Sequence, residues 1–111
     1  DRSHQESLLA RNHRIARRIA AQSAVLLRNS GRLLPLPKAG TIAVVGAFAV
    51  YPRFQGAGSS RINAFTIEDP LSSIRAAVGD SATVTYSAGY DVGLCRDHPS
   101  AIKQAAAVAK Q

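Results

Sequence analysis

The first part of the chain repeats apolar and polar residues with a helical period. From Ser7 to Asn29, apolar side chains recur every three or four positions and share one stripe when residues are placed at about 100° steps. The stripe contains Leu8, Ile15, Ile19 and Leu26, widened by Leu9, Ala16, Ser23 and Leu27. The pattern predicts one long helix over residues 7–29, with Ser7 as its N-cap and Gly31 as the left-handed residue that ends it.

The next apolar segments have the length and composition of strands. Residues 41–46 (TIAVVG) form an apolar run without alternation, which is typical of a strand covered on both faces in a parallel sheet. Residues 83–86 (TVTY) predict a second, shorter strand. Residues 33–37 (LLPLP) cannot continue a helix because two prolines remove N–H donors, so we expect an extended connector with buried leucines.

Two shorter helices complete the pattern. Asp69 and Pro70 predict a helix that runs to about Val78, with Asp69 as N-cap, Pro70 in the first turn and Gly79 at its end. Pro99 begins another helix, predicted over residues 100–111. Their inner faces are predicted to carry Leu71, Ile74 and Val78 in the first helix, and Ile102, Ala105, Ala106 and Ala109 in the second.

The order of these elements predicts an α/β fold, a partial open and mainly parallel sheet with flanking helices. Only two strands are evident, and two parallel strands alone cannot build a covered sheet. We therefore expect the last helix to cross over to a third strand. On this interpretation, residues 1–111 are a single partial domain.

Length, cysteine usage and hydropathy narrow the class of protein. The chain has 111 residues, of which 46% are hydrophobic, a globular composition for at most one ordinary domain. Cys95 is the single cysteine and excludes an internal disulfide. No apolar run approaches the roughly 20 residues of a membrane span, so no membrane is expected as a partner. The polar N-terminus is not a signal peptide, which favours the cytoplasm without fixing the compartment.

Charge raises the question of a nucleic-acid partner. Fourteen Lys and Arg residues against seven Asp and Glu residues give a net charge of +7. The arginines of the first helix gather opposite its apolar stripe: Arg11, Arg14, Arg17, Arg18 and Arg28. Only 5% of the residues are aromatic, so basic residues are not interleaved with stacking side chains. We interpret this basic face as solvated or protein-facing, with no nucleic acid bound.

The long segment over residues 47–65 has no periodicity, and loops of this length are often functional. Its Gly-x-Gly at Gly56 and Gly58 lies too far past the strand, and lacks the third glycine, for a dinucleotide site. Ser59 and Ser60 lack a nucleophile elbow. The sequence therefore predicts no nucleotide cofactor and no serine nucleophile.

Other reactive side chains have ordinary interpretations. Cys95 lies near His98, but a lone cysteine beside a histidine is usually incidental. His4 and His13 are too poorly placed to share a metal ion. The adjacent acids Glu68 and Asp69 are explained by a helix cap rather than by acid–base chemistry. No catalytic residue, metal site or other cofactor site is assigned.

Several segments together resemble a known family. Residues 13–29 (HRIARRIAAQSAVLLRN) are followed by LLPL at 33–36, IAVVG at 42–46, QGAGSSR at 55–61 and YSAG at 86–89. This succession is similar to the start of the C-terminal α/β-sandwich domain of glycoside hydrolase family 3, the β-glucosidase and β-xylosidase group. The resemblance covers residues 8–111.

The resemblance implies a retaining hydrolase of terminal β-linked sugars that acts through a covalent glycosyl-enzyme. Its nucleophile would be an Asp of an N-terminal barrel domain, which no stretch of this sequence resembles. Its acid/base would be a Glu in a later part of the sandwich domain. The implied partners are a β-linked oligosaccharide or aryl glycoside and the missing barrel domain. The first helix would pack on the sheet and turn its basic face to that domain.

The resemblance also implies a place for substrate contacts. The family's loop after the first sandwich strand leans toward the active site, and residues 55–61 match it. Gly58, Ser59, Ser60 and Arg61 are therefore the candidate substrate-binding residues. An alternative interpretation of equal weight is that this loop shapes an interdomain turn and contacts no sugar. Alternative functions are a stand-alone carbohydrate-binding or scaffold module and a small basic nucleic-acid-binding domain.

Overall fold

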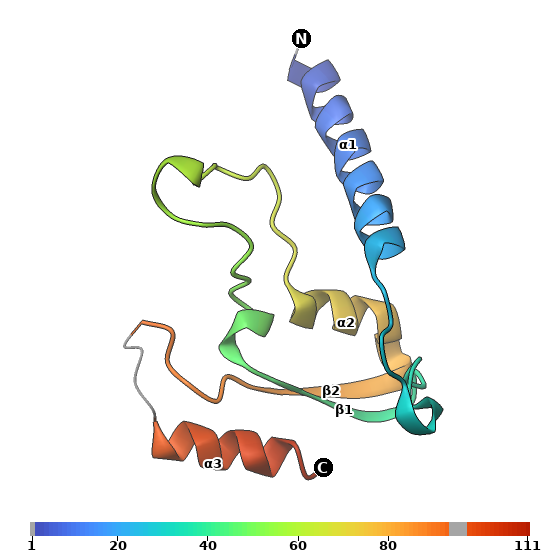
Figure 1. Cartoon of the computed structure of the whole chain (residues 1–111), viewed down its shortest axis with the longest axis vertical. Helices are drawn as coiled ribbons and strands as arrows, with labels where there is room; N and C mark the ends of the chain where they lie inside the picture. Colours follow the sequence, from blue (N-terminus) through green and yellow to red (C-terminus); the bar gives the residue numbers. More distant parts are fainter. Residues whose placement is uncertain (1, 94–97) are drawn as a thin grey trace. The chain divides into compact units, whose positions relative to one another are not determined.

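The computed structural model describes residues 2–93 and 98–111. Its main elements are α1 (Arg2–Ser23), β1 (Gly40–Val45), α2 (Pro70–Val78), β2 (Ala82–Ser87) and α3 (Pro99–Val108), labelled in Figure 1. Short 3-10 turns lie at Ser30–Arg32, Ala47–Ala49, Gly58–Ser60 and Gly79–Ser81. The chain divides into two compact units. The helical unit holds α1, the segment to Leu36 and residues 63–66, and the sheet unit holds residues 37–62 and 67–111.

The long helix of the helical unit is confirmed, but its predicted bounds are wrong. It begins at Arg2, so Ser7 lies inside it and is not the N-cap. Arg2 and Glu6 form an ion pair of 3.6 Å one turn apart, which supports the extra N-terminal turn. The helix ends at Ser23, whose hydroxyl donates to the carbonyl of Ile19 (2.7 Å). Such local side-chain bonds compete with the helical ladder.

Gly31 has the left-handed conformation that the sequence predicts, with φ +69°, but in a separate turn beyond the helix. Asn29 stabilises this turn: its side-chain amide donates to the Leu34 carbonyl (2.8 Å) and accepts from the Leu34 N–H (2.9 Å). The leucines of the connector are exposed rather than buried, with Leu33 67% exposed.

The apolar stripe of α1 is also at the surface. No described residue of α1 is buried, and Ile19 is 56% exposed. His13 is half-buried, although the helical pattern places it on the polar side. No described helix is long and apolar enough to traverse a lipid bilayer.

The sheet unit confirms the α/β prediction. β1 and β2 are parallel, with Thr41 opposite Thr83 and Val45 opposite Ser87. The Gly46 N–H extends the pairing by donating to the Ser87 carbonyl (2.9 Å). The expectation that β1 is covered on both faces is wrong for the described residues, because its side chains alternate between exposed and half-buried.

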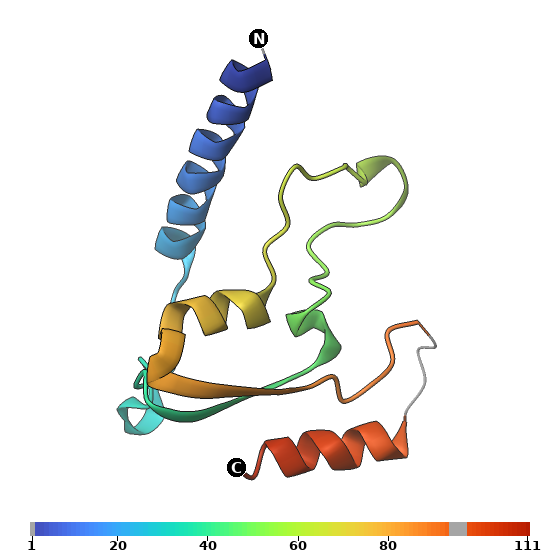
Figure 2. The same cartoon turned by 180° about the vertical axis from the view of Figure 1, so that it is seen from behind.

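The helices of this unit flank the two strands, with α2 on one side and α3 on the other (Figures 1 and 2). α2 has the predicted start and end: Asp69 accepts from the Ser72 N–H (2.8 Å), and Gly79 has φ +54°. α3 begins at Pro99 as predicted and ends at Val108 rather than at residue 111.

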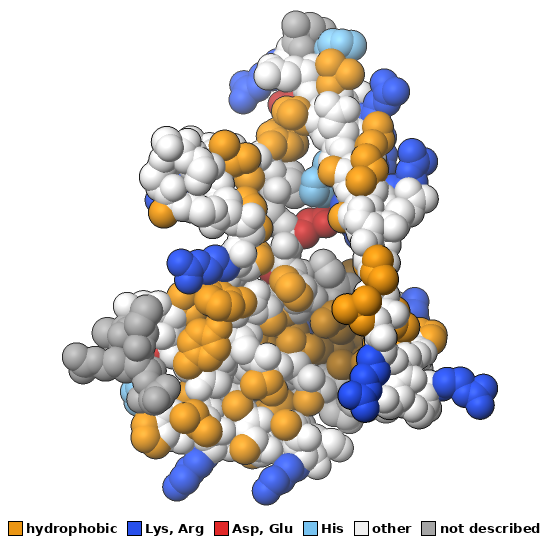
Figure 3. All heavy atoms as spheres, in the orientation of Figure 1, with side chains coloured by type: hydrophobic (Ala, Val, Ile, Leu, Met, Phe, Trp, Pro, Cys, Tyr) orange, Lys and Arg blue, Asp and Glu red, His pale blue; other side chains and the backbone are white. Residues whose placement is uncertain are grey.

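The core of the sheet unit is small. Its buried apolar residues among those described are Ala47, Leu71, Val78 and Ala105. Large apolar side chains nearby remain open to solvent, including Val45 (49% exposed) and Ile102 (52%). Apolar atoms are correspondingly prominent on the face of the molecule shown in Figure 3. The sheet therefore retains apolar surface that further packing can cover.

Candidate functional site

The carboxyl ends of β1 and β2 define one edge of the sheet unit. Because the strands are parallel, the loops that follow Val45 and Ser87 leave from the same edge. In open α/β sheets this is the edge where ligands bind. The candidate substrate-binding residues Gly58, Ser59, Ser60 and Arg61 belong to the loop after β1.

A single side chain closes this loop. The Gln55 amide donates from Nε2 to the Ile62 carbonyl (3.1 Å), and its Oε1 accepts from the Ile62 N–H (2.9 Å). The two bonds join the ends of the segment 55–62. The Gln55 amide pairs with both backbone groups of Ile62, as the backbone of a neighbouring strand would. Loops held by side-chain bonds of this kind present a defined surface rather than a loose chain.

The loop is turned tightly between these ends. Gly58 has φ +69°, a left-handed conformation that glycine adopts without strain, and its carbonyl accepts from the Arg61 N–H (3.0 Å). The Ser60 hydroxyl donates to the Ala57 carbonyl (3.0 Å). A Cβ on Gly56 would lie 2.9 Å from Ser60 Oγ, so a larger residue at position 56 would displace the Ser60 hydroxyl from its present place.

The structure thus brings the four candidate residues together on one exposed turn. Ser60 is partly committed to the turn through its hydroxyl. Ser59 and Arg61 present exposed side chains. This arrangement is compatible with a binding loop, and contact with a sugar stays a prediction.

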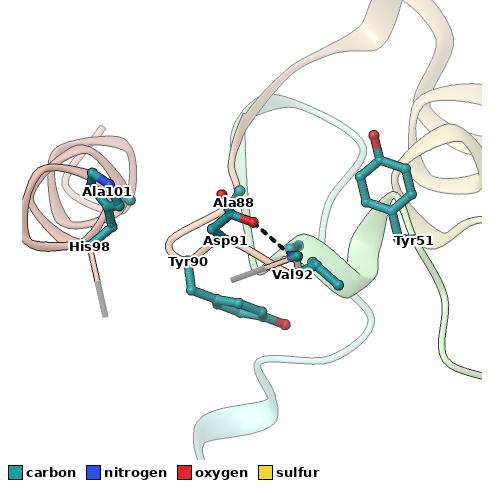
Figure 4. A pocket seen from close by; sticks show the side chains of 9 residues that line it. Tyr51, Ala88, Tyr90, Asp91, Val92, His98 and Ala101 are labelled. Atoms are coloured by element: carbon teal, nitrogen blue, oxygen red, sulfur yellow. Dashed lines mark hydrogen bonds between the residues drawn. The ribbon is translucent and has the colours of Figure 1, made fainter. Parts of the chain in front are cut away.

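A second feature at the same edge was not predicted. A hollow of about 620 Å³ opens between the loop after β1, the segment after β2 and the start of α3 (Figure 4). Its lining residues are Ala47, Tyr51, Ala88, Tyr90, Asp91, Val92, Gly93, His98 and Ala101. The available signal was their position, since Tyr51 and Tyr90 each follow a strand at its carboxyl end.

The hollow has aromatic walls and a few polar groups. The Tyr90 ring meets Phe48 edge to face, with centroids 5.8 Å apart. Asp91 Oδ1 accepts from the Gly93 N–H (2.7 Å), and His98 Nδ1 lies 3.0 Å from Ser100 Oγ. Such a lining suits a small molecule with both apolar and hydroxyl surface.

Tyr86 of β2 interacts with two tyrosines that line the hollow, Tyr51 and Tyr90. Burial raises the pKa of the Tyr86 phenol above its usual value, and the neighbouring Tyr51 and Tyr90 raise it further. Tyr86 therefore remains a neutral hydroxyl well into alkaline solution.

The other residues considered for catalysis or metal binding either have structural roles or lie outside the described residues. The Ser72 backbone N–H holds the pKa of the Asp69 carboxyl below its usual value, in keeping with the helix cap. No cluster of three or more His, Cys, Asp or Glu side chains suited to a metal ion occurs within residues 2–93 and 98–111. Cys95 lies outside the described residues.

The two parallel strands and the flanking helices of the sheet unit define an α/β fold. Residues 24–111 match the family described as "Glycosyl hydrolase family 3 C-terminal domain", and the chain belongs to this family.

Similar curated proteins are named β-glucosidases. Thermostable β-glucosidase B of Acetivibrio thermocellus is 49% identical over 79 residues, covering 71% of this chain and 10% of that protein. A β-glucosidase of Rhizobium radiobacter is 39% identical over 83 residues, covering 73% and 10%. The periplasmic β-glucosidase of Salmonella typhimurium is 42% identical over 78 residues, covering 69% and 10%. The chain thus spans about a tenth of the length of these relatives.

Proposed function

We propose that the whole protein is a retaining β-glycosidase that hydrolyses terminal β-linked glucosides or xylosides. In this proposal the 111 residues form the start of its C-terminal α/β-sandwich domain. The observation that carries the proposal is the family match over residues 24–111, together with relatives that are all named as β-glucosidases.

The catalytic carboxylates belong to other parts of the whole protein. Retaining hydrolysis needs two carboxyl groups about 5 Å apart on either side of the glycosidic bond. The adjacent acids available here are Glu68 and Asp69, and Asp69 is held by the first turn of α2. The chain alone is therefore inactive in this proposal, and its partner is the barrel domain that supplies the nucleophile.

The role of this segment is to contact the sugar through residues 58–61. The Arg61 guanidinium and the Ser59 hydroxyl supply donors for sugar hydroxyls, and both side chains are exposed. Gly58 and Ser60 shape the turn and leave room for a ring to approach the backbone. The substrate class is a β-linked oligosaccharide or an aryl β-glycoside.

Kinetics of the whole protein on p-nitrophenyl β-glucoside and β-xyloside test both parts of the proposal. We expect hydrolysis by the whole protein and none by the 111-residue chain. Ser59→Ala and Arg61→Ala should each raise KM about tenfold, the usual effect of losing one substrate hydrogen bond. Ser81→Ala is the matched control, because Ser81 is exposed at the opposite end of β2.

The outcomes separate the two parts. Absence of glycoside hydrolysis by the whole protein would overturn the proposed activity. Normal kinetics in both loop variants, with activity intact, would overturn only the contact between residues 58–61 and the sugar, and would leave the interdomain-turn interpretation.

A further inference from the structure

The loop with the candidate substrate-binding residues has no buried side chain of its own. Every residue from Gly56 to Ile62 is exposed, and Gln55 is half-buried. Packing therefore does not hold the path of this backbone, and its shape depends on hydrogen bonds. Two bonds belong to the turn at Gly58–Ser60 and span three residues each, whereas the two bonds of Gln55 span seven residues.

Arg61 lies between two peptide groups, and a hydrogen bond holds each of them. The peptide group before it is held because the Arg61 N–H donates to the Gly58 carbonyl (3.0 Å). The peptide group after it is held because the Ile62 N–H donates to Gln55 Oε1 (2.9 Å). Peptide groups are planar, so holding both of them sets the backbone angles of Arg61, which are φ −74° and ψ 126°. The direction in which the Arg61 side chain leaves the backbone therefore depends on Gln55.

The amide of Gln55 suits this role because it carries a donor and an acceptor on one planar group. Its Nε2 donates to the Ile62 carbonyl (3.1 Å) while its Oε1 accepts from the N–H of the same residue. A carboxylate at position 55 can replace only the acceptor, and alanine can replace neither. Both residues belong to the sheet unit, so their pairing does not depend on the helical unit.

Ser59 is held in a different way. It lies inside the turn at Gly58–Ser60, whose own bonds do not involve Gln55. The left-handed backbone of Gly58, with φ +69°, belongs to the same turn. Loss of the Gln55 amide should therefore release Arg61 and leave Ser59 largely in place.

We infer that Gln55 is a positioning residue, which holds Arg61 in the orientation that binds a sugar hydroxyl. This inference rests on the proposed function, in which residues 58–61 contact the substrate. A side chain that is ordered before the substrate arrives does not have to be ordered during binding, so the substrate binds more tightly. Gln55 therefore acts on substrate binding and not on cleavage of the glycosidic bond.

Kinetics of the whole protein on p-nitrophenyl β-glucoside and β-xyloside give the first test. Gln55→Ala should raise KM about fivefold and leave kcat within about twofold, as expected when binding alone is weakened. Gln55→Glu keeps the acceptor for the Ile62 N–H, so its KM should lie between those of Gln55→Ala and the unaltered protein. Gln104→Ala, at an exposed site of α3, removes the same amide elsewhere and should leave both constants unchanged.

Double variants distinguish positioning of Arg61 from a general effect on the loop. A residue that acts through Arg61 has nothing left to position once that guanidinium is gone. In an Arg61→Ala background, Gln55→Ala should therefore change KM by less than about twofold. In a Ser59→Ala background, Gln55→Ala should still raise KM by the full factor of about five.

The outcomes separate the inference from the proposed function. An active protein in which Gln55→Ala has a normal KM, or keeps its full effect in the Arg61→Ala background, would overturn the inference and leave the activity intact. A fall in kcat as large as the rise in KM would also overturn it. Unchanged amide exchange at Ile62 in Gln55→Ala would overturn it whether or not the protein is active. Absence of glycoside hydrolysis by the whole protein would instead overturn the proposed function.

Discussion

Gln55 joins the two ends of the candidate loop through both atoms of its amide. Gln55→Ala removes the donor and the acceptor together, and Gln55→Glu keeps only the acceptor for the Ile62 N–H. We expect faster amide exchange at Ile62 and faster proteolysis within residues 55–62 in the alanine variant, with an intermediate effect for glutamate. Gln104→Ala, at an exposed site of α3, is the control. Unchanged exchange at Ile62 in Gln55→Ala would show that other contacts close the loop.

Tyr86 makes the sheet unit sensitive to alkali. Its pKa is raised by burial in the folded chain, whereas the unfolded chain ionises near the usual value of 10.0. Stability is therefore unaffected by this group below pH 9 and falls as the pH rises above 10. Tyr86→Phe should lose less melting temperature between pH 9 and pH 11 than the unaltered chain, while the two follow parallel curves from pH 7 to pH 9. An equal loss in both would contradict the raised pKa of Tyr86.

At the scale of elements, α2 depends on its N-cap. The lowered pKa of Asp69 means that its carboxylate stabilises the fold above the usual value of 3.8, and that this contribution is lost as the pH falls through the folded-state pKa. Asp69→Ala should lower the melting temperature at pH 7, and the difference should shrink at pH 3. Asp69→Asn is the control, because asparagine caps helices without a charge. Thermal melts followed by circular dichroism check this, and identical melts for Asp69→Ala and the unaltered chain at pH 7 would refute it.

Because β1 has an open edge in the two-stranded sheet, we expect the 111-residue chain to associate. Unpaired strand edges with apolar side chains template pairing with other chains, and charged side chains suppress it. Ala43→Lys should reduce the concentration-dependent association of the chain, measured by sedimentation, whereas Ala76→Lys on α2 should not. A sharp, cooperative melt of a strictly monomeric chain would contradict this prediction.

The elements that the sequence predicts best have local signals at both ends. α2 is predicted at its bounds because Asp69, Pro70 and Gly79 each act through adjacent backbone groups. The bounds of α1 were predicted wrongly for two reasons. Its first turn, residues 2–6, has no apolar side chain to reveal it, and no glycine or proline marks its end at Ser23. The exposure of β1 could not be predicted from the sequence. An apolar run indicates that a strand tends to be buried, but it does not show which other segments cover the strand.

The candidate site was only partly predictable for a related reason. Residues 58–61 are contiguous, so one loop presents them together. Tyr51, Tyr90 and His98 meet only because two parallel strands end at one edge and α3 begins beside it. The sequence pattern does not show that these three segments lie close together, so only the structure revealed the hollow.

For the whole molecule, the family match and the small core lead to the same interpretation. The sheet unit leaves Val45 and Ile102 half exposed, and the chain corresponds to about a tenth of each β-glucosidase relative. Both observations support the proposal that the 111 residues are a segment of a longer glycosidase, in which other parts complete the sheet and the active site.

Proton NMR of aryl β-glucoside hydrolysis tests this account most directly. The whole protein should release the β-anomer of the sugar first, since a double displacement retains configuration, and the 111-residue chain should release none. Turnover by the 111 residues alone, or no turnover of any β-glucoside or β-xyloside by the intact protein, would contradict the account.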